Sequence, residues 1–127
     1  MLLVDDSEQF RQSLLSTLQE ICGLCITGEA ADGLEAVQKA ESIKPDIVLL
    51  DIGLPKLNGL NTAELIRKCS PESKIVFLTL EKDPDVVKAA LDTGALGYVH
   101  KLQAGTELKT AVEAALRGQQ FVSPNLT

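Results

Sequence analysis

The stretch IVLLD, residues 47–51, decides the fold of this chain. Its four consecutive apolar residues have the length and composition of a strand buried on both faces of a parallel sheet. Runs of the same kind predict further strands at residues 1–4, 25–28, 75–78 and 96–99. The sequence therefore predicts five short strands spread over the whole chain.

Between these runs, apolar residues recur at the spacing of amphipathic helices. They are Phe10, Leu14, Leu18 and Ile21; Leu34, Val37 and Ile43; Leu60, Ala63 and Ile66; Val86, Val87, Ala90 and Leu91; and Leu108, Val112, Ala115 and Leu116. Strict alternation of strands and helices predicts parallel strands joined by right-handed crossovers, with helices on both faces. The predicted fold class is α/β, a flavodoxin-like doubly wound (βα)5 three-layer sandwich with sheet order 2-1-3-4-5.

Local signals support the helix boundaries. Ser7 can cap the first helix, Pro84 follows Asp83 at the start of the fourth, and Gly94 can end that helix. A length of 127 residues suits one independently folding domain.

Composition excludes some partners. Eighteen acidic against twelve basic residues give a net charge of -6, and aromatic residues are 3% of the chain, so we expect no direct grip on nucleic acid. No apolar run exceeds four residues, far below the roughly 18 needed to cross a bilayer. With no basic leader either, we expect a cytoplasmic protein without membrane contact.

Carboxylates follow two of the predicted strands. Asp5 and Asp6 come after the first strand, and Asp51 comes after the third. These strands are neighbours in the predicted order, and ligands bind at the carboxyl ends of strands in such sheets. Three carboxylates this close together repel one another unless their pKa values rise or a divalent cation neutralises them. Oxygen ligands with open positions for phosphate oxygens are typical of a Mg²⁺ site.

Two further polar residues occupy strand ends. Thr79 follows the fourth strand and offers a hydroxyl, and Lys101 follows the fifth and offers a positive charge. Together with the acids, they would stabilise a phosphoryl group in transfer. Asp51 stands alone at its strand end and is the best candidate for a carboxylate nucleophile, while Asp5 and Asp6 form a pair suited to a metal.

As a set, these residues resemble the receiver domain of two-component response regulators. The resemblance runs from Met1 to about Gly118 and rests on the motifs VDDS (4–7), DIGLPKLNG (51–59), FLT (77–79) and GALGYVHK (94–101). It implies that Asp51 accepts a phosphoryl group from a phosphohistidine of a sensor histidine kinase. It also implies that Mg²⁺ is held by Asp5, Asp6, Asp51 and the backbone carbonyl of Gly53.

The resemblance assigns the remaining strand-end residues as well. Thr79 and Lys101 would bind phosphoryl oxygens, and Thr79 and Tyr98 would form the switch that repacks on activation. The chain would be a regulatory protein rather than an enzyme, and phosphorylation would promote a homodimer.

Three residues depart from, or stand outside, the pattern. Leu102 occupies a position that is often proline in this family, which leaves the geometry of the Lys101–Leu102 bond open. Leu80 stands where many relatives have a small residue, so we expect it to crowd the phosphoryl pocket and slow attack by water. His100 is expected to be a surface residue on an edge strand.

The end of the chain changes character. Residues 118–127, GQQFVSPNLT, are polar and uncharged, and resemble the exit from receivers of the LuxR/NarL/FixJ-type subfamily. We expect a receiver domain at 1–118 and, at 119–127, the start of a linker to a C-terminal helix-turn-helix domain absent from this chain. DNA would be bound only through that domain.

Other functions remain open. A stand-alone phosphorelay or protein-interaction receiver would lack a DNA-binding domain. An aspartyl phosphatase is disfavoured because Gly53 stands where such enzymes usually carry a second acid, and a flavin site lacks its phosphate loop.

The three cysteines raise two functional hypotheses, a redox pair and a zinc site. Cys22 and Cys25 form a C-x-x-C string, but it closes a helical pattern instead of opening a helix. Zinc would need additional ligands, for which Cys69 and His100 remain. We expect all three cysteines to be small buried hydrophobic residues.

Overall fold

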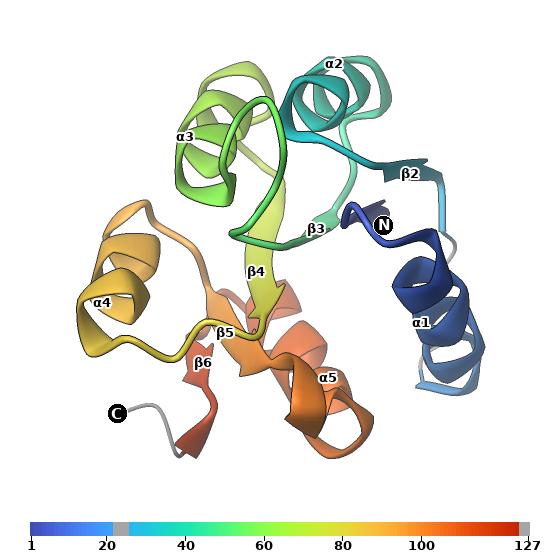
Figure 1. The fold of residues 1–127 in the computed structure, drawn as a ribbon, viewed down its shortest axis with the longest axis vertical. Coiled ribbons are helices and arrows are strands. Elements are labelled where there is room, and N and C mark those ends of the chain that lie inside the picture. The colour runs from blue at the N-terminus through green and yellow to red at the C-terminus, as the bar shows by residue number, and fades with distance from the viewer. Residues whose placement is uncertain (22–25, 125–127) are drawn as a thin grey trace.

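The strands form one parallel sheet in the order β2-β1-β3-β4-β5-β6. The computed structural model describes residues 1–21 and 26–124 (Figure 1). Its strands are β1 (Leu2–Val4), β2 (Gly28–Ala30), β3 (Ile47–Leu50), β4 (Lys74–Thr79), β5 (Gly97–His100) and β6 (Phe121–Val122). The helices are α1 (Glu8–Ile21), α2 (Gly33–Ile43), α3 (Gly59–Cys69), α4 (Pro84–Asp92), α5 (Ala104–Leu116) and the single-turn 3-10 helix η1 (Lys101–Gln103). The predicted fold class and the order 2-1-3-4-5 are confirmed.

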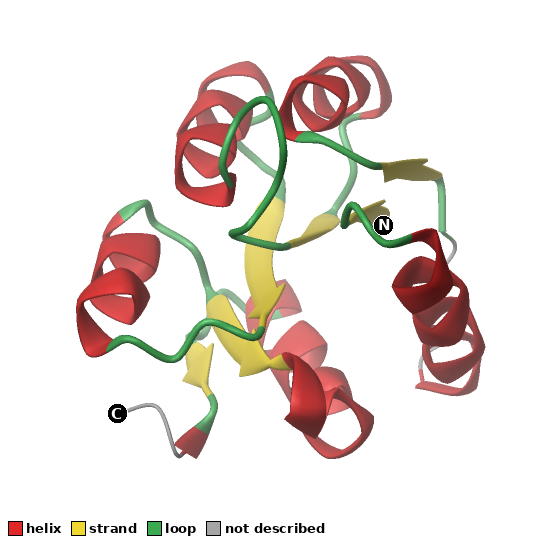
Figure 2. Ribbon diagram, in the orientation of Figure 1, coloured by secondary structure: helices red, strands yellow, loops and turns green. Residues whose placement is uncertain are grey.

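Helices cover both faces of the sheet (Figures 1 and 2). Alternate residues of each central strand point to opposite faces, as the pleat of a strand requires. In β3, Val48 and Leu50 pack with α2, α3 and α4, whereas Ile47 and Leu49 pack with α1 and α5. All four side chains are almost fully buried, which explains why this strand reads as an unbroken apolar run.

The helix boundaries follow the expected signals. The hydroxyl of Ser7 accepts a hydrogen bond from the amide of Phe10 at 3.2 Å in the first turn of α1. The carboxylate of Asp83 accepts one from Asp85 at 2.8 Å, with Pro84 as the first residue of α4. Gly94, just after α4, has a φ of 93°, a left-handed conformation that glycine adopts without strain.

One predicted strand begins later in the chain than expected. The strand expected at 25–28 is β2, which begins at Gly28 and pairs with Leu2–Val4. Its sequence, GEA, has no apolar pattern, so this edge strand is defined by its pairing with β1. Cys22 and Cys25 lie outside the described residues, and Cys69 is half-buried beside the core.

The sixth strand lies where a linker was expected. Phe121 and Val122 pair in parallel with Gly97 and Tyr98, so the chain after α5 extends the sheet. The hydroxyl of Ser123 accepts a hydrogen bond from the amide of His100 at 3.1 Å, and also bonds the carboxylate of Glu107.

This added strand overturns the expectation for His100. Because β6 covers β5, β5 is not an edge strand, and His100 is buried with 7% of its surface exposed. Its Nδ1 accepts a hydrogen bond from the amide of Leu102 at 3.3 Å and so opens the turn of η1. None of the peptide bonds in the described residues is cis, and the Lys101–Leu102 bond is among them.

Candidate functional site

Three carboxylates meet at the carboxyl ends of β1 and β3. Backbone hydrogen bonds fix their places, since the amide of Asp5 donates to Ala30 at 3.0 Å and that of Asp51 to Val4 at 3.1 Å. Carboxylate oxygens of Asp5, Asp6 and Asp51 lie within 4.8 Å of one another. Asp5 and Asp51 are buried and Asp6 is exposed, so the cluster opens to solvent on one side.

Lys101 joins two of these acids. Its Nζ lies 2.7 Å from Oδ2 of Asp5 and 3.0 Å from Oδ2 of Asp51. The lysine side chain is only 13% exposed, and it reaches from the end of β5 to the acids that follow β1 and β3. A buried ammonium bound by two carboxylates is a strong charge-assisted contact. The sequence predicts Lys101 as a ligand of phosphoryl oxygens, and in the resting structure its ammonium also offsets the charge of two of the acids.

The cluster shifts the ionisation of its members. Burial raises the pKa of Asp5, and the hydrogen bonds from Lys101 and Ser7 offset that effect only in part. Burial by itself lowers the pKa of Lys101, but its bonds to Asp5 and Asp51 outweigh burial and raise it. The lysine is therefore firmly charged, whereas the ionised form of Asp5 is held at a cost.

The start of α1 holds the acidic loop in place. The amide of Ser7 donates to Oδ1 of Asp5 at 2.8 Å. Arg11, one turn into the helix, donates from its guanidinium to the backbone carbonyl of Asp5, and its Nε lies 2.9 Å from the Glu29 carboxylate. Sequence reasoning missed Arg11, whose signal would have been a basic residue one helical turn after the helix cap.

The loop after Asp51 packs tightly under α3. A Cβ on Gly59 would lie 2.2 Å from the carbonyl oxygen of Asp51, so only glycine lets the helix start this close. The amide of Gly53 faces the Asp51 side chain, with its nitrogen 3.4 Å from Oδ1. A part for the Gly53 carbonyl in metal binding stays a prediction.

Thr79 and Tyr98 meet through the loop after β4. The hydroxyl of Thr79 accepts a hydrogen bond from the amide of Glu81 at 3.2 Å, and the hydroxyl of Tyr98 donates to the carbonyl of Glu81 at 2.8 Å. Tyr98 is fully buried beside Phe77, and burial together with the charge of Glu81 raises its pKa. The main chain of Glu81 thus links the two predicted switch residues.

The acid cluster suits a small divalent cation. Its ligands are hard carboxylate oxygens from two adjacent strand ends, with one side open to water and phosphate oxygens. Asp6 has no part in the Lys101 ion pairs, so its carboxylate is the one most readily offered to a metal.

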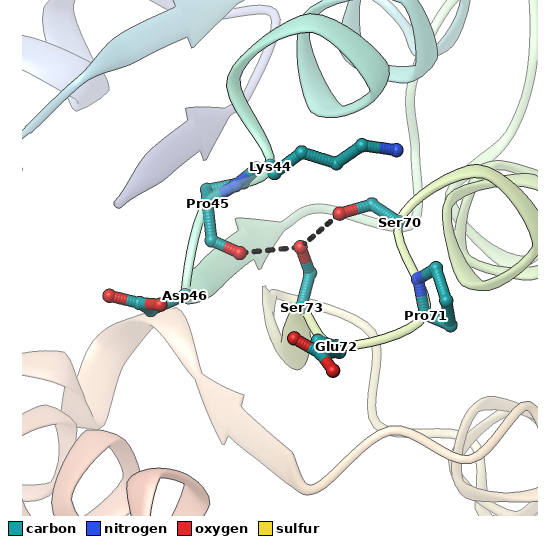
Figure 3. Close-up of a pocket in the computed structure, with 7 residues that line it drawn as sticks. All are labelled: Lys44, Pro45, Asp46, Ser70, Pro71, Glu72 and Ser73. Carbon is teal, nitrogen blue, oxygen red and sulfur yellow. Dashed lines mark hydrogen bonds between the residues drawn. The ribbon is translucent and has the colours of Figure 1, made fainter.

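A cavity of about 300 Å³ lies at the other end of the sheet (Figure 3). It is lined by the turns before β3 and β4, around Lys44–Asp46 and Ser70–Ser73. Figure 3 shows Ser73 between the carbonyl of Pro45 and the hydroxyl of Ser70, which lies 2.6 Å away. The cavity is no part of the acidic site, because it lies before β3 and β4 begin, whereas the acids follow the carboxyl ends of β1 and β3.

Comparisons with known proteins agree with this geometry. The family model described as "Response regulator receiver domain" matches residues 1–113. "Response regulator GacA" of Pseudomonas viridiflava is 34% identical over 127 residues, covering 99% of this chain and 59% of that protein. The "Nitrate/nitrite response regulator protein NarL" of Escherichia coli K12 is 32% identical, covering 100% of this chain and 59% of that protein.

A solved structure is equally similar. The crystal structure of a two-component response regulator of the LuxR family from Aurantimonas sp. SI85-9A1 is 32% identical, with a TM-score of 0.93. The match covers 98% of this chain and 89% of that one. The chain therefore belongs to the response regulator receiver domain family of two-component signalling, and its relatives are of the LuxR/NarL type.

Two facts bound this conclusion. The chain spans 59% of the length of the curated relatives it matches. Across the described residues, no helix combines the length and apolar character needed to cross a membrane.

Proposed function

We propose that this chain is a phosphoacceptor receiver, in which Asp51 takes a phosphoryl group from a phosphohistidine of a sensor histidine kinase. The observation that carries the proposal is the Lys101 ammonium, bound to both Asp5 and Asp51 within a cluster of three carboxylates. A nucleophilic oxygen, a fixed positive charge and a ligand set for a cation are thereby held at one strand edge.

The transfer is an in-line displacement at phosphorus. A carboxylate oxygen of Asp51 forms the new P–O bond while the bond from phosphorus to the donor's imidazole nitrogen breaks, and the imidazole leaves with the electron pair. Lys101 already lies 3.0 Å from Oδ2 of Asp51, so it can pass to the incoming phosphoryl oxygens after a small movement. Asp5, Asp6, Asp51 and the Gly53 carbonyl would hold Mg²⁺, which supplies charge neutralisation for those oxygens.

The resting contacts indicate how the signal would spread. A phosphoryl oxygen that recruits the Thr79 hydroxyl would compete with the amide of Glu81 for it. The loop that moves with Thr79 also receives the hydroxyl of Tyr98. Phosphorylation would therefore shift the population of packings around Tyr98 on the face formed by α4, β5 and α5.

We propose that the output of the signal belongs to a separate domain. The relatives it matches are longer proteins, and one of them, from Bacillus subtilis, is named a transcriptional regulatory protein. We propose a cytoplasmic protein that dimerises on phosphorylation and acts on DNA through a C-terminal domain. Reading the codons beyond Thr127 separates this proposal from a stand-alone phosphorelay receiver.

Intact-mass measurement tests the chemical step. The chain is incubated with acetyl phosphate and MgCl₂ and weighed, alongside Asp51→Asn and Asp46→Asn. Asp46 is an exposed acid at the opposite end of β3, so its substitution is a matched control. We expect one added phosphoryl group in the parent and in Asp46→Asn, and none in Asp51→Asn. A wild-type chain that gains no mass would refute the proposal.

A further inference from the structure

The Lys101 ammonium has a third partner besides its two carboxylates. Its Nζ lies 4.4 Å from the centroid of the Phe10 ring, over the ring face. This distance is within the range at which a cation is attracted to the negative face of an aromatic ring. Phe10 stands in the first turn of α1, four residues after Asp6, and is half-buried against the core.

The ring differs from the carboxylates in what phosphorylation does to it. On the proposed function, phosphorylation turns the Asp51 carboxylate into an acyl phosphate, and Asp5 becomes engaged with a cation. Both ionic partners of Lys101 therefore change during the reaction. The Phe10 ring neither ionises nor binds a metal, so its attraction for the ammonium persists throughout.

The backbone of Phe10 is tied to the acidic loop, and its ring packs against the core. The amide of Phe10 donates to the hydroxyl of Ser7 at 3.2 Å, which ties it to the acidic loop. The void around Phe10, bordered by Leu14, Leu49 and Leu78, measures about 10 Å³. That space holds at most one water molecule, so the ring packs closely against the core on this side.

We propose that Phe10 is a positioning residue for Lys101, and that its ring face holds the ammonium over Asp51 while its carboxylate partners change. The inference rests on the proposed function of Asp51 for its effect on rate, but the contact itself exists in the resting protein.

A fluorination series at position 10 tests this idea without changing shape. Mono-, di- and trifluorinated phenylalanines are placed at position 10 alone, and Phe10→Leu and Phe10→Tyr are added. Each fluorine withdraws charge from the ring face and weakens its attraction for a cation at nearly constant volume. We expect the rate of phosphorylation by acetyl phosphate to fall stepwise along the series, with about a fivefold loss for Phe10→Leu and a near-normal rate for Phe10→Tyr.

A spectroscopic readout is independent of the reaction. In the resting protein, the ring current of Phe10 should shift the methylene proton resonances of Lys101 nearest Nζ upfield, and Phe10→Leu should abolish that shift. Phe121→Leu, which removes an aromatic ring at β6, serves as the control and should change neither readout.

The outcomes separate the two proposals. If the wild-type chain gains no phosphoryl group, the proposed function fails, whatever the resonances show. If it is phosphorylated but the fluorination series gives a constant rate, or Phe10→Tyr is as slow as Phe10→Leu, the role of Phe10 is overturned. Absence of the upfield shift in the wild-type chain would overturn it as well.

Discussion

Asp5 is a buried carboxylate in a cluster of like charges. It is almost fully buried, at 4% exposure, next to another buried carboxylate and the exposed one of Asp6. A single ammonium serves both buried acids, so the cluster keeps a net negative charge. Burial raises the pKa of Asp5, and the contact with Lys101 does not fully offset this effect.

The sign of this effect predicts a stabilising substitution. A carboxyl whose pKa is raised by folding stabilises the fold below its ordinary value of 3.8, and this contribution is lost as pH rises through the folded pKa. Asp5→Asn keeps an acceptor for the Ser7 amide and removes the charge. We expect its free energy of unfolding in urea at about pH 7 to rise by about 1 kcal/mol.

The gain should depend on pH. Below 3.8, where the parent carboxyl is protonated in both states, the two proteins should become equally stable. The exposed Asp46→Asn should have no comparable effect at either pH. A loss of stability in Asp5→Asn near neutral pH would contradict this description of the site.

Leu80 bears on the lifetime of the phosphorylated state. It directly follows Thr79, and its side chain is 58% exposed in the resting structure, so it is not packed inside the acidic site. We expect Leu80→Ala to lose its phosphoryl group several-fold faster, because a smaller side chain admits water. Loss of the added mass after donor removal measures this rate, with the exposed Leu102→Ala as control. Equal rates for Leu80→Ala and the parent would show that Leu80 gives no protection.

At the scale of elements, the central strands could be predicted from the sequence, because a strand buried on both faces needs an unbroken apolar run. The run at Ile47–Leu50 is a strand because neither side of β3 meets water, and Asp51 ends it. The edge strands β2 and β6 were not predicted at their observed positions, since they depend on hydrogen bonds to a neighbouring strand more than on their own side chains. Because β6 was not predicted, β5 was expected at the edge of the sheet and His100 at the surface, whereas His100 is buried.

The site was predictable to the level of strand ends, but no further. Asp5, Asp6 and Asp51 come together because parallel strands end at one edge. The reach of Lys101 to two carboxylates, and its contact with the Phe10 ring, depend on side-chain conformations that no sequence spacing defines.

The close contact between α3 and the Asp51 backbone predicts a sensitive glycine. In Gly59→Ala the new Cβ would lie 2.2 Å from the carbonyl oxygen of Asp51 and 2.5 Å from Cα of Ile52. Because both of these atoms belong to the backbone, they cannot move aside without displacing the loop after Asp51. We therefore expect a loss of about 1–3 kcal/mol in unfolding free energy and slower phosphorylation.

Gly105 provides the contrast for this test. It lies in the first turn of α5, and a Cβ there would meet no atom within 4 Å. Gly105→Ala should gain up to about 1 kcal/mol from helix propensity. Equal effects of the two substitutions would mean that α3 does not press on the Asp51 backbone.

For the molecule as a whole, the net charge of -6 has a local counterpart, since three of the acidic residues cluster at the proposed cation site. A cation that binds only the folded chain stabilises it by mass action. We expect MgCl₂ in place of EDTA to raise the melting temperature by several degrees, and expect the exposed Asp6→Asn to lose most of that rise. Asp46→Asn should retain it, and an undiminished rise in Asp6→Asn would place the cation elsewhere.

The central claim is that Asp51 receives the phosphoryl group, and locating the modified residue tests it most directly. The phosphorylated chain is reduced with borohydride, which converts an aspartyl phosphate to homoserine, and its peptides are sequenced by mass spectrometry. We expect homoserine at position 51 and intact aspartate at positions 5 and 6. A label at either of those acids, on His100 or on a serine, with position 51 unchanged, would contradict it.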